Sequence, residues 1–136
     1  GIAALAGSGT VATLLPGTML FLGRTKQAPA RALIDGGAAV ALASDFNPGT
    51  SPTVNFPLVL TLGVSQLRLS AGEAFVAATV NGAAALGLAD QVGQLAPGFR
   101  ADLALFDVQD HREIPYWYGA HRWLRSWCGG RAVQPA

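Results

Sequence analysis

Two short apolar runs dominate the first half of the chain. Thr10–Leu15 and Ala38–Ala43 are apolar without alternation, a pattern typical of strands covered on both faces by helices. Ile2–Ala6 indicates the end of a helix before the first run, and Pro29–Ile34 predicts a short helix between the two. Pro16-Gly17 predicts a turn at the end of the first strand. The order helix, strand, helix, strand with short connections predicts a parallel α/β sheet.

Helical spacing of apolar and small residues continues after the second run. Val54–Leu67 is apolar nearly all round and predicts a buried helix, with Thr53 as its cap. Ser70 and Glu73 match a capping box, in which each side chain bonds the other residue's backbone N–H. We expect this second helix to continue on small residues and to stop near Gly87.

The pattern changes to short strands from Gly93 onward. Gly93–Leu95 and Ala101–Phe106 predict strands around a Pro-Gly turn. Trp123–Cys128 predicts a third strand, which a Gly-Gly hairpin turn joins to Arg131–Val133. The chain therefore combines an α/β part over residues 1–90 with a small β part over residues 91–136.

Composition restricts the class of protein. The 136 residues are 51% hydrophobic and 12% charged with a formal net charge of +1, which excludes a disordered chain and gives no basic field for nucleic acid. A complete (β/α)₈ barrel needs about 250 residues. No apolar run approaches the roughly 20 residues of a membrane span. A lone cysteine, Cys128, excludes an intrachain disulfide and favours the reducing cytoplasm.

The most polar, turn-rich stretch follows the second strand and contains Asp45. Ligands of parallel sheets bind beyond the carboxyl ends of the strands. A carboxylate in that place can hold a metal ion or take a proton from a metal-bound water. A turn or a helix cap is the structural alternative for Asp45.

Five segments in order carry a family resemblance. Ser44–Thr50 resembles the loop after the last barrel strand in the imidazolonepropionase family of the metal-dependent amidohydrolase superfamily. Val11–Gly17 resembles the strand before it, and Ala28–Gly37 resembles the connecting helix. Thr79–Leu88 and Gly93–Leu103 match patterns found across the superfamily. The resemblance covers residues 1–133 and implies a C-terminal fragment of such an enzyme.

This resemblance implies a fold. Residues 1–90 would be the last two strands and helices of a TIM-like (β/α)₈ barrel. Residues 91–136 would be part of a small flanking β-sandwich domain. The parent enzyme would be a cytoplasmic homo-oligomer that acts on a small molecule, without nucleic-acid or membrane partners.

The same resemblance implies roles for four residues. Asp45 would ligate zinc or iron and shuttle a proton, while Asn47, Gly49 and Thr50 would contact the substrate. The reaction would be hydrolysis of the cyclic amide C–N bond of 4-imidazolone-5-propanoate, which gives N-formimidoyl-L-glutamate in histidine degradation. The metal would polarise the carbonyl and activate the water.

The chain departs from the family pattern in its histidines. The resemblance implies several imidazole ligands on earlier strands, which have no counterpart here, whereas His111 and His121 lie in the β part outside the matched metal motifs. A catalytic transition metal usually has at least three protein ligands. We therefore expect an incomplete ligand set and an inactive fragment. We expect His111 at the surface. We expect His121 in an aromatic cluster that packs the β part against the barrel, together with Tyr116, Trp117, Tyr118 and Trp123.

Two alternatives remain open at the level of sequence. One is another cyclic amidohydrolase or deaminase of the same superfamily. The other is a non-catalytic folding or interaction module, in which the Asp45 loop is structural.

Overall fold

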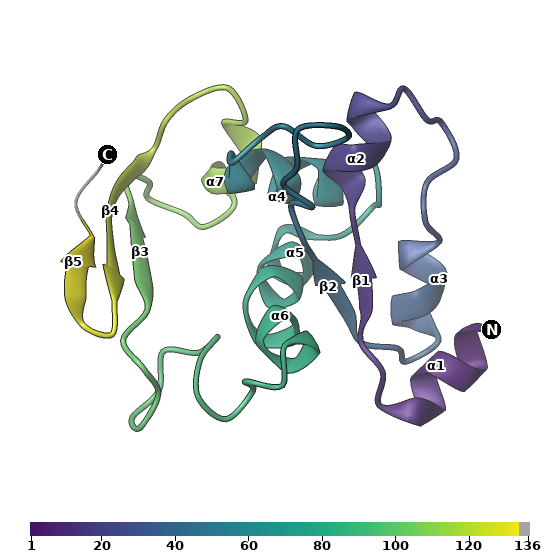
Figure 1. Cartoon of the computed structure of the whole chain (residues 1–136), viewed down its shortest axis with the longest axis horizontal. Coiled ribbons are helices and arrows are strands. Elements are labelled where there is room, and N and C mark those ends of the chain that lie inside the picture. The colour runs from purple at the N-terminus through teal and green to yellow at the C-terminus, as the bar shows by residue number, and fades with distance from the viewer. Residues whose placement is uncertain (134–136) are drawn as a thin grey trace.

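A two-stranded parallel sheet forms the centre of the α/β part. The computed structural model describes residues 1–133, and in it β1 (Ala12–Leu14) pairs with β2 (Val40–Leu42) in parallel. Leu14 lies opposite Leu42 in the register. Both predicted strands are present (Figure 1), but the predicted burial is confirmed for β2 alone, because in β1 only Leu14 is buried and Thr13 is exposed.

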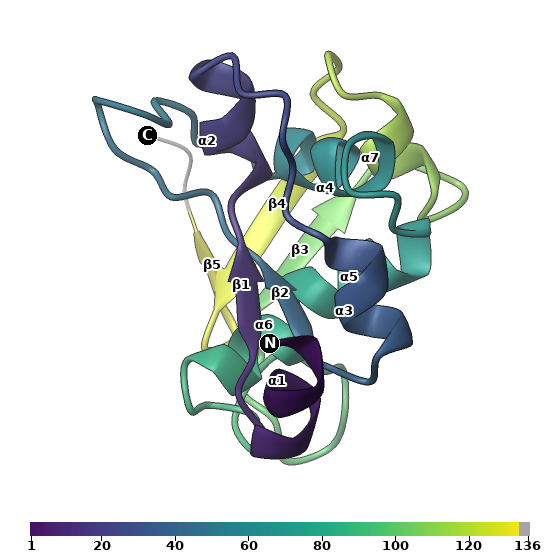
Figure 2. The same cartoon turned by 90° about the vertical axis from the view of Figure 1, so that its right-hand side faces the viewer.

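Two short helices come before β1 and between β1 and β2 in the chain. α1 (Ile2–Ser8) packs on α3 (Ala30–Asp35), which in turn contacts β2 (Figures 1 and 2). α1 ends at Gly9, whose left-handed φ of 69° suits a residue without a Cβ. Both predicted helices are present.

The predicted turn at Pro16-Gly17 is wrong. Pro16 instead begins α2 (Pro16–Phe21), which follows β1 after a single residue. Proline at a first helical position loses no hydrogen bond, because that N–H has no partner inside the helix. A Pro-Gly pair therefore opens a helix here, and that helix lies at the carboxyl end of β1.

The next helix is shorter than predicted and has a different cap. α4 (Phe56–Ser65) begins after Asn55, whose Oδ1 accepts from the Leu58 N–H at 3.2 Å. Thr53, the predicted cap, instead accepts from the Asn55 N–H through Oγ1 at 3.1 Å. The predicted burial is confirmed, since Val59 and Leu60 are enclosed.

The capping box is confirmed, whereas the long helix behind it breaks. α5 (Ala71–Ala78) begins with the Ser70 side chain accepting from Glu73 N–H and the Glu73 carboxylate accepting from Ser70 N–H. At Thr79 the backbone leaves helical geometry, with φ −118° and ψ −80°. α6 (Val80–Ala85) then continues in a new direction. Across the break, the Asn81 amide donates to the Val40 carbonyl of β2 at 2.8 Å.

The core lies between the strand pair and α3, α4 and α5. All three residues of β2 are buried, and α4 approaches β2 closely at Gly63, where a Cβ would lie 2.8 Å from Leu42 Cδ1. The largest part of this core comes from apolar residues of the α/β part: Leu14, Ala30, Leu33, Ala38, Val40, Leu42, Val59, Leu60, Leu67, Leu69, Ala74 and Ala77.

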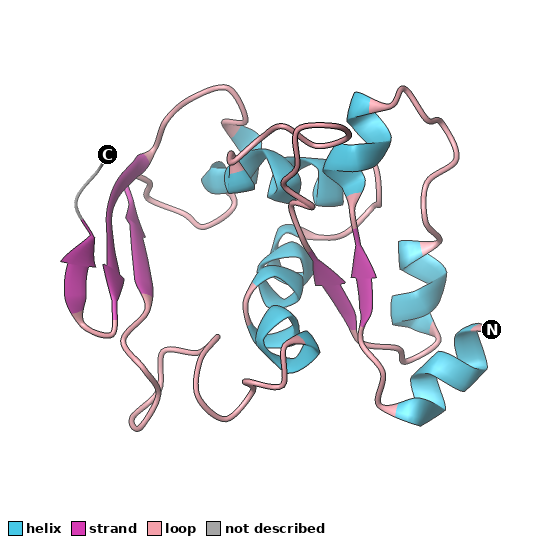
Figure 3. Cartoon of the chain, in the orientation of Figure 1, coloured by secondary structure: helices cyan, strands magenta, loops and turns pink. Residues whose placement is uncertain are grey.

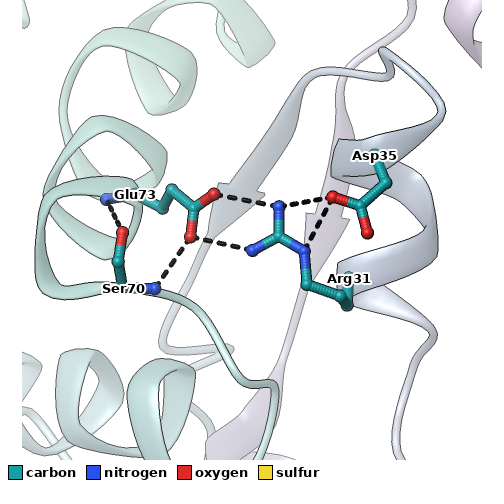
Figure 4. A network of polar contacts seen from close by, with 4 residues as sticks. All are labelled: Arg31, Asp35, Ser70 and Glu73. Atoms are coloured by element: carbon teal, nitrogen blue, oxygen red, sulfur yellow. Dashed lines mark hydrogen bonds and ion pairs between the residues drawn. The ribbon is translucent and has the colours of Figure 1, made fainter.

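An ion-pair network ties α3 to the start of α5 (Figure 4). The Arg31 guanidinium donates to both carboxylate oxygens of Glu73, at 3.0 and 2.9 Å, and also pairs with Asp35. These hydrogen bonds from Arg31, together with that from the Ser70 N–H, lower the pKa of Glu73 to about 2. The capping carboxylate of α5 therefore also holds the neighbouring helix.

The β part is a three-stranded antiparallel sheet. β3 (Leu103–Phe106), β4 (Trp123–Cys128) and β5 (Arg131–Val133) are in sequence order, with a Gly129-Gly130 turn in the second hairpin. These strands confirm the prediction for Ala101–Phe106 and the later segments. Figure 3 shows only loop between α6 and β3, so the strand predicted at Gly93–Leu95 is wrong.

Gly93 has a different role from the one predicted. Its φ is +92°, and a Cβ there would lie 2.8 Å from the Thr79 carbonyl oxygen and 2.9 Å from Ala83 Cβ. The loop therefore crosses directly over the junction of α5 and α6, and this close approach excludes any side chain.

A single turn of helix attaches the β part to the core. α7 (Glu113–Tyr116) packs on α4, where Ile114 is buried and the Thr61 hydroxyl donates to the Pro115 carbonyl at 2.6 Å. Within residues 1–133, no helix is both long and apolar enough to cross a membrane.

Candidate functional site

Asp45 lies at the carboxyl edge of the parallel strand pair, three residues after the end of β2. Its side chain is exposed and its φ is +50°, in the left-handed region that only glycine enters freely. Aspartate tolerates this region better than most residues. Left-handed non-glycine residues cluster at functional sites, where the surrounding structure holds them.

Asn47 organises the loop after Asp45. Its side-chain amide donates to the Asp45 carbonyl at 2.6 Å and to Thr50 Oγ1 at 2.9 Å. Its Oδ1 accepts from the backbone N–H groups of Gly49 and Thr50, at 2.9 and 2.8 Å. The structure therefore brings all four predicted site residues into one hydrogen-bonded turn.

Ser51 is bonded to both ends of this turn, at Ser44 and at Asn47. It is only 1% exposed, its hydroxyl donates to the Ser44 carbonyl at 2.6 Å, and its backbone pairs with that of Asn47. A Cβ on Gly17 would lie 3.3 Å from Ser51 Oγ, so the start of α2 packs directly against the loop. A cavity of about 320 Å³ adjoins this contact, lined by Gly17, Leu20, Phe21, Ser51, Pro52, Thr53 and Leu58.

Thr18 is the one side chain outside the loop that bonds the Asp45 carboxylate in the described part of the chain. Thr18 Oγ1 donates to Asp45 Oδ2 at 2.8 Å, although 27 positions separate the two residues. The sequence analysis missed both Thr18 and Ser51. The sequence does contain a signal for Thr18, because it is the first polar residue after β1. Ser44 and Asp45 are the first polar residues after β2, so both strands are followed by polar side chains at the same edge of the sheet.

Asp45 can supply one ligand to a metal ion, but the side chains around it do not complete a metal site in residues 1–133. No group of three or more His, Cys, Asp or Glu side chains gathers anywhere in residues 1–133. Asp45 offers an exposed carboxylate at the strand edge, where a ligand belongs. The remaining ligands of a catalytic transition metal would have to come from outside the described residues.

Neither histidine belongs to this site. His111 is exposed, as predicted, and its ring contacts Phe75 edge-on with the ring centres 5.7 Å apart. His121 is also exposed and lines a separate cavity of about 690 Å³ between α4, α5 and the β sheet.

The aromatic residues around α7 are less buried than predicted. Tyr116 is 71% and Tyr118 63% exposed, while Trp117 makes an edge contact with Tyr116 and carries the Arg122 guanidinium 5.4 Å from its ring centre. The β part packs on the α/β part through Ile114 and Pro115 instead. The expectation that these aromatic rings provide the packing is therefore wrong for Tyr116 and Tyr118.

Comparison with known families identifies the class of protein. The model of the amidohydrolase family matches residues 5–133, so the chain belongs to the amidohydrolase family. Solved structures agree with this fold. An adenosine deaminase from Xanthomonas campestris with bound zinc superposes with a TM-score of 0.87 at 23% identity, over 96% of this chain and 33% of that protein. Guanine deaminase from E. coli gives 0.80 at 24% identity, over 99% and 36%.

Curated relatives are more similar in sequence. The imidazolonepropionase of Geobacillus kaustophilus (strain HTA426) is 47% identical over 133 residues, which are 98% of this chain and 31% of the relative. That of Rubrobacter xylanophilus is 51% identical over 119 residues, 88% of this chain and 28% of the relative. The chain thus spans about a third of the length of the curated relatives it matches.

Proposed function

We propose that this chain forms one edge of the active site of an imidazolonepropionase. The observation that carries the proposal is the Asp45 turn, which stands at the carboxyl edge of the parallel strands in a chain similar to imidazolonepropionases over 98% of its length. The reaction is hydrolysis of the cyclic amide C–N bond of 4-imidazolone-5-propanoate to N-formimidoyl-L-glutamate. The parent enzyme is cytoplasmic and homo-oligomeric, and it binds neither nucleic acid nor membranes.

The architecture we propose extends beyond these residues. Residues 1–90 supply the last two strands and helices of a (β/α)₈ barrel, and residues 91–136 supply part of a flanking β-sandwich domain. The accessible surface supports an architecture that extends beyond these residues. It amounts to 8453 Å², whereas a folded monomer of this mass exposes about 6,700 Å². The excess indicates surface that other segments cover.

Asp45 is the residue we assign to proton transfer and metal ligation. A zinc or iron ion held there would act as a Lewis acid and lower the pKa of a bound water. The Asp45 carboxylate accepts a proton from the attacking water and delivers it to the ring nitrogen as the C–N bond breaks. Hydroxide thus joins the carbonyl carbon and the proton joins the nitrogen, which balances the hydrolysis.

Asn47, Gly49 and Thr50 are the residues we assign to substrate contact. They occupy the turn immediately after Asp45, so a substrate held by them lies beside the carboxylate. Both donor and acceptor atoms of the Asn47 amide already bond within the turn. Asn47 therefore shapes the contact surface, while Gly49 leaves room for the substrate because it carries no side chain.

The test is an assay of the full-length protein that contains this chain, with Asp45→Asn. Asparagine also tolerates left-handed φ, so this change removes the charge and leaves the backbone unstrained. We expect kcat for imidazolonepropionate hydrolysis to fall by a factor of about 10²–10⁴. Asp90→Asn, at an exposed turn position, is the matched control and should keep full activity.

Two outcomes would replace the proposal. Near-normal activity of Asp45→Asn would favour a structural role for the loop, as in a non-catalytic module. An active wild-type protein that instead prefers another cyclic amide or an aminated ring in a substrate panel would assign it to another branch of the family. Deaminases are among the structures with the same fold, which makes such rings the first alternatives to assay.

A further inference from the structure

Asp45 is restrained from three directions, and only one of them acts on its carboxylate. Ser51 holds the Ser44 carbonyl just before it, and Asn47 holds the carbonyl of Asp45 itself. The side chain is still free to rotate about its own bonds after these contacts. Thr18 provides the remaining restraint through its 2.8 Å hydrogen bond to Oδ2.

We propose that Thr18 is a positioning residue that presents Asp45 to the metal. Its hydroxyl fixes the carboxylate through Oδ2 and leaves Oδ1, which has no hydrogen-bond donor among residues 1–133, as the oxygen available for ligation. This inference rests on the proposed function, because it takes Asp45 as the ligand. It adds a residue that the family resemblance did not supply.

Thr18 itself is held in a rigid place. Pro16 and Gly17, at the start of α2, are buried. Gly17 approaches the loop so closely that a Cβ would come within 3.3 Å of Ser51 Oγ and 3.9 Å of the Ser44 carbonyl oxygen. The distance between α2 and the loop is therefore set by packing. The third residue of the helix then stands at a fixed distance from the carboxylate.

The chemistry explains why such a restraint matters at an exposed carboxylate. An unrestrained aspartate samples several rotamers, and only one of them suits a metal held by other ligands. Ligating carboxylates are usually hydrogen-bonded by neighbouring side chains for this reason. Removal of such a partner typically costs 10- to 100-fold in metal affinity or activity.

The experiment compares Thr18→Val, which keeps the shape and loses the hydroxyl, with Thr18→Ser, which keeps the hydroxyl. Both are made in the full-length protein, and zinc affinity is measured by competition with a chelator alongside kcat and KM. We expect Thr18→Val to weaken zinc binding and lower kcat by about 10- to 100-fold with little change in KM. We expect Thr18→Ser to remain within about threefold of wild type. Thr10 is exposed two residues before the start of β1, so Thr10→Val should change neither quantity.

Each result separates this inference from the function on which it rests. Thr18→Val with wild-type zinc affinity, beside an Asp45→Asn variant that loses it, would overturn the inference alone. A protein that does not hydrolyse imidazolonepropionate, yet loses zinc affinity on both changes, would overturn the substrate and support the inference. Unchanged zinc affinity in Asp45→Asn would overturn both. If the valine variant does not fold, Thr18→Ala replaces it in the comparison, because it removes the hydroxyl without adding a methyl group.

Discussion

The two sheets of the molecule differ in how completely they are covered. Every residue of β2 is buried, whereas every residue of β5 is exposed. β3 shows the contrast within a single strand. Phe106 packs against the core, while Leu103 and Leu105 are 37% and 49% exposed and Ala104 is exposed as well. Helices α3, α4 and α5 all contact β2, whereas Phe106 is the one residue of the three antiparallel strands that packs against the core cluster.

The two parts are nevertheless joined through α7. Ile114 is 8% exposed and belongs to the same core cluster as the strands and helices of residues 1–90. The boundary we propose near residue 90 therefore separates two sheets rather than two cores. Stability should depend on residues of the first part far more than on the outer face of the second.

The largest expected contrast is between two leucines. Leu42 is 4% exposed in β2 and Leu124 is 56% exposed in β4. Leu42→Ala should lower the free energy of unfolding by about 2–5 kcal/mol, since it leaves a cavity, and Leu124→Ala by less than about 1 kcal/mol. Urea unfolding of the 136-residue chain, followed by far-UV circular dichroism, measures both. Equal losses would mean that the outer face of the β sheet is buried in solution, for example by self-association.

A smaller effect tests the link between the parts. Gly93 and Gly98 both have φ near +90°, but a Cβ would clash with the Thr79 carbonyl only at Gly93. Gly98→Ala should cost about 1–2 kcal/mol, the strain of a left-handed residue. Gly93→Ala should cost about 1–3 kcal/mol more, because the loop must move off α5 and α6. Thermal unfolding compares the two variants. Identical melting temperatures would show that the loop does not pack on the helix junction.

The sequence predicted the elements whose signals are local. Ala38–Ala43 was recognisable because a fully buried strand is apolar at every position, and Thr10–Leu15 because a short, mostly apolar run ends at Pro16-Gly17. Ser70 and Glu73 were recognisable because a capping box has a fixed spacing. Pro16-Gly17 and Gly93–Leu95 misled for one physical reason. Proline and glycine mark a change in chain direction, but they do not decide whether a helix, a strand or a loop follows. That depends on packing against distant residues, here Ser51 for Gly17 and Thr79 for Gly93.

The site residues likewise fall into those that the sequence could predict and those that depend on the folded structure. Asp45 was predictable from its place after a buried strand, whereas the family resemblance supplied Asn47, Gly49 and Thr50. Thr18 lies 27 residues from Asp45, and only the parallel pairing of β1 with β2 brings their ends together. The register of that pairing was not readable from apolar runs without alternation, so the partner of the carboxylate could not be named.

The smallest expected effect concerns the two kinds of ion pair in the molecule. Arg31 and Glu73 are 42 positions apart and join two helices, whereas Arg112 and Asp110 are 2 positions apart within one loop. The hydrogen bonds from Arg31 and Ser70 lower the pKa of Glu73 to about 2 in the folded chain. Glu73 therefore adds stability above its ordinary pKa near 4.5, and this contribution is lost as the pH falls towards 2. Glu73→Gln should lower the free energy of unfolding at pH 7 by about 1 kcal/mol or less and flatten the acid limb between pH 4.5 and 2.

The matched variant is Arg112→Gln. Hydrogen bonds from Arg112 lower the pKa of Asp110, so this change also removes the partner of a carboxylate. Stability depends on the difference in pKa between folded and unfolded chains, not on the folded value alone. A pair two residues apart partly persists after unfolding, whereas Arg31 and Glu73 meet only in the folded state. Urea unfolding between pH 2 and 7 should therefore change its acid limb in Glu73→Gln and hardly in Arg112→Gln. A larger change in Arg112→Gln would mean that the loop pair, rather than the bridge between α3 and α5, controls the acid stability of the fold.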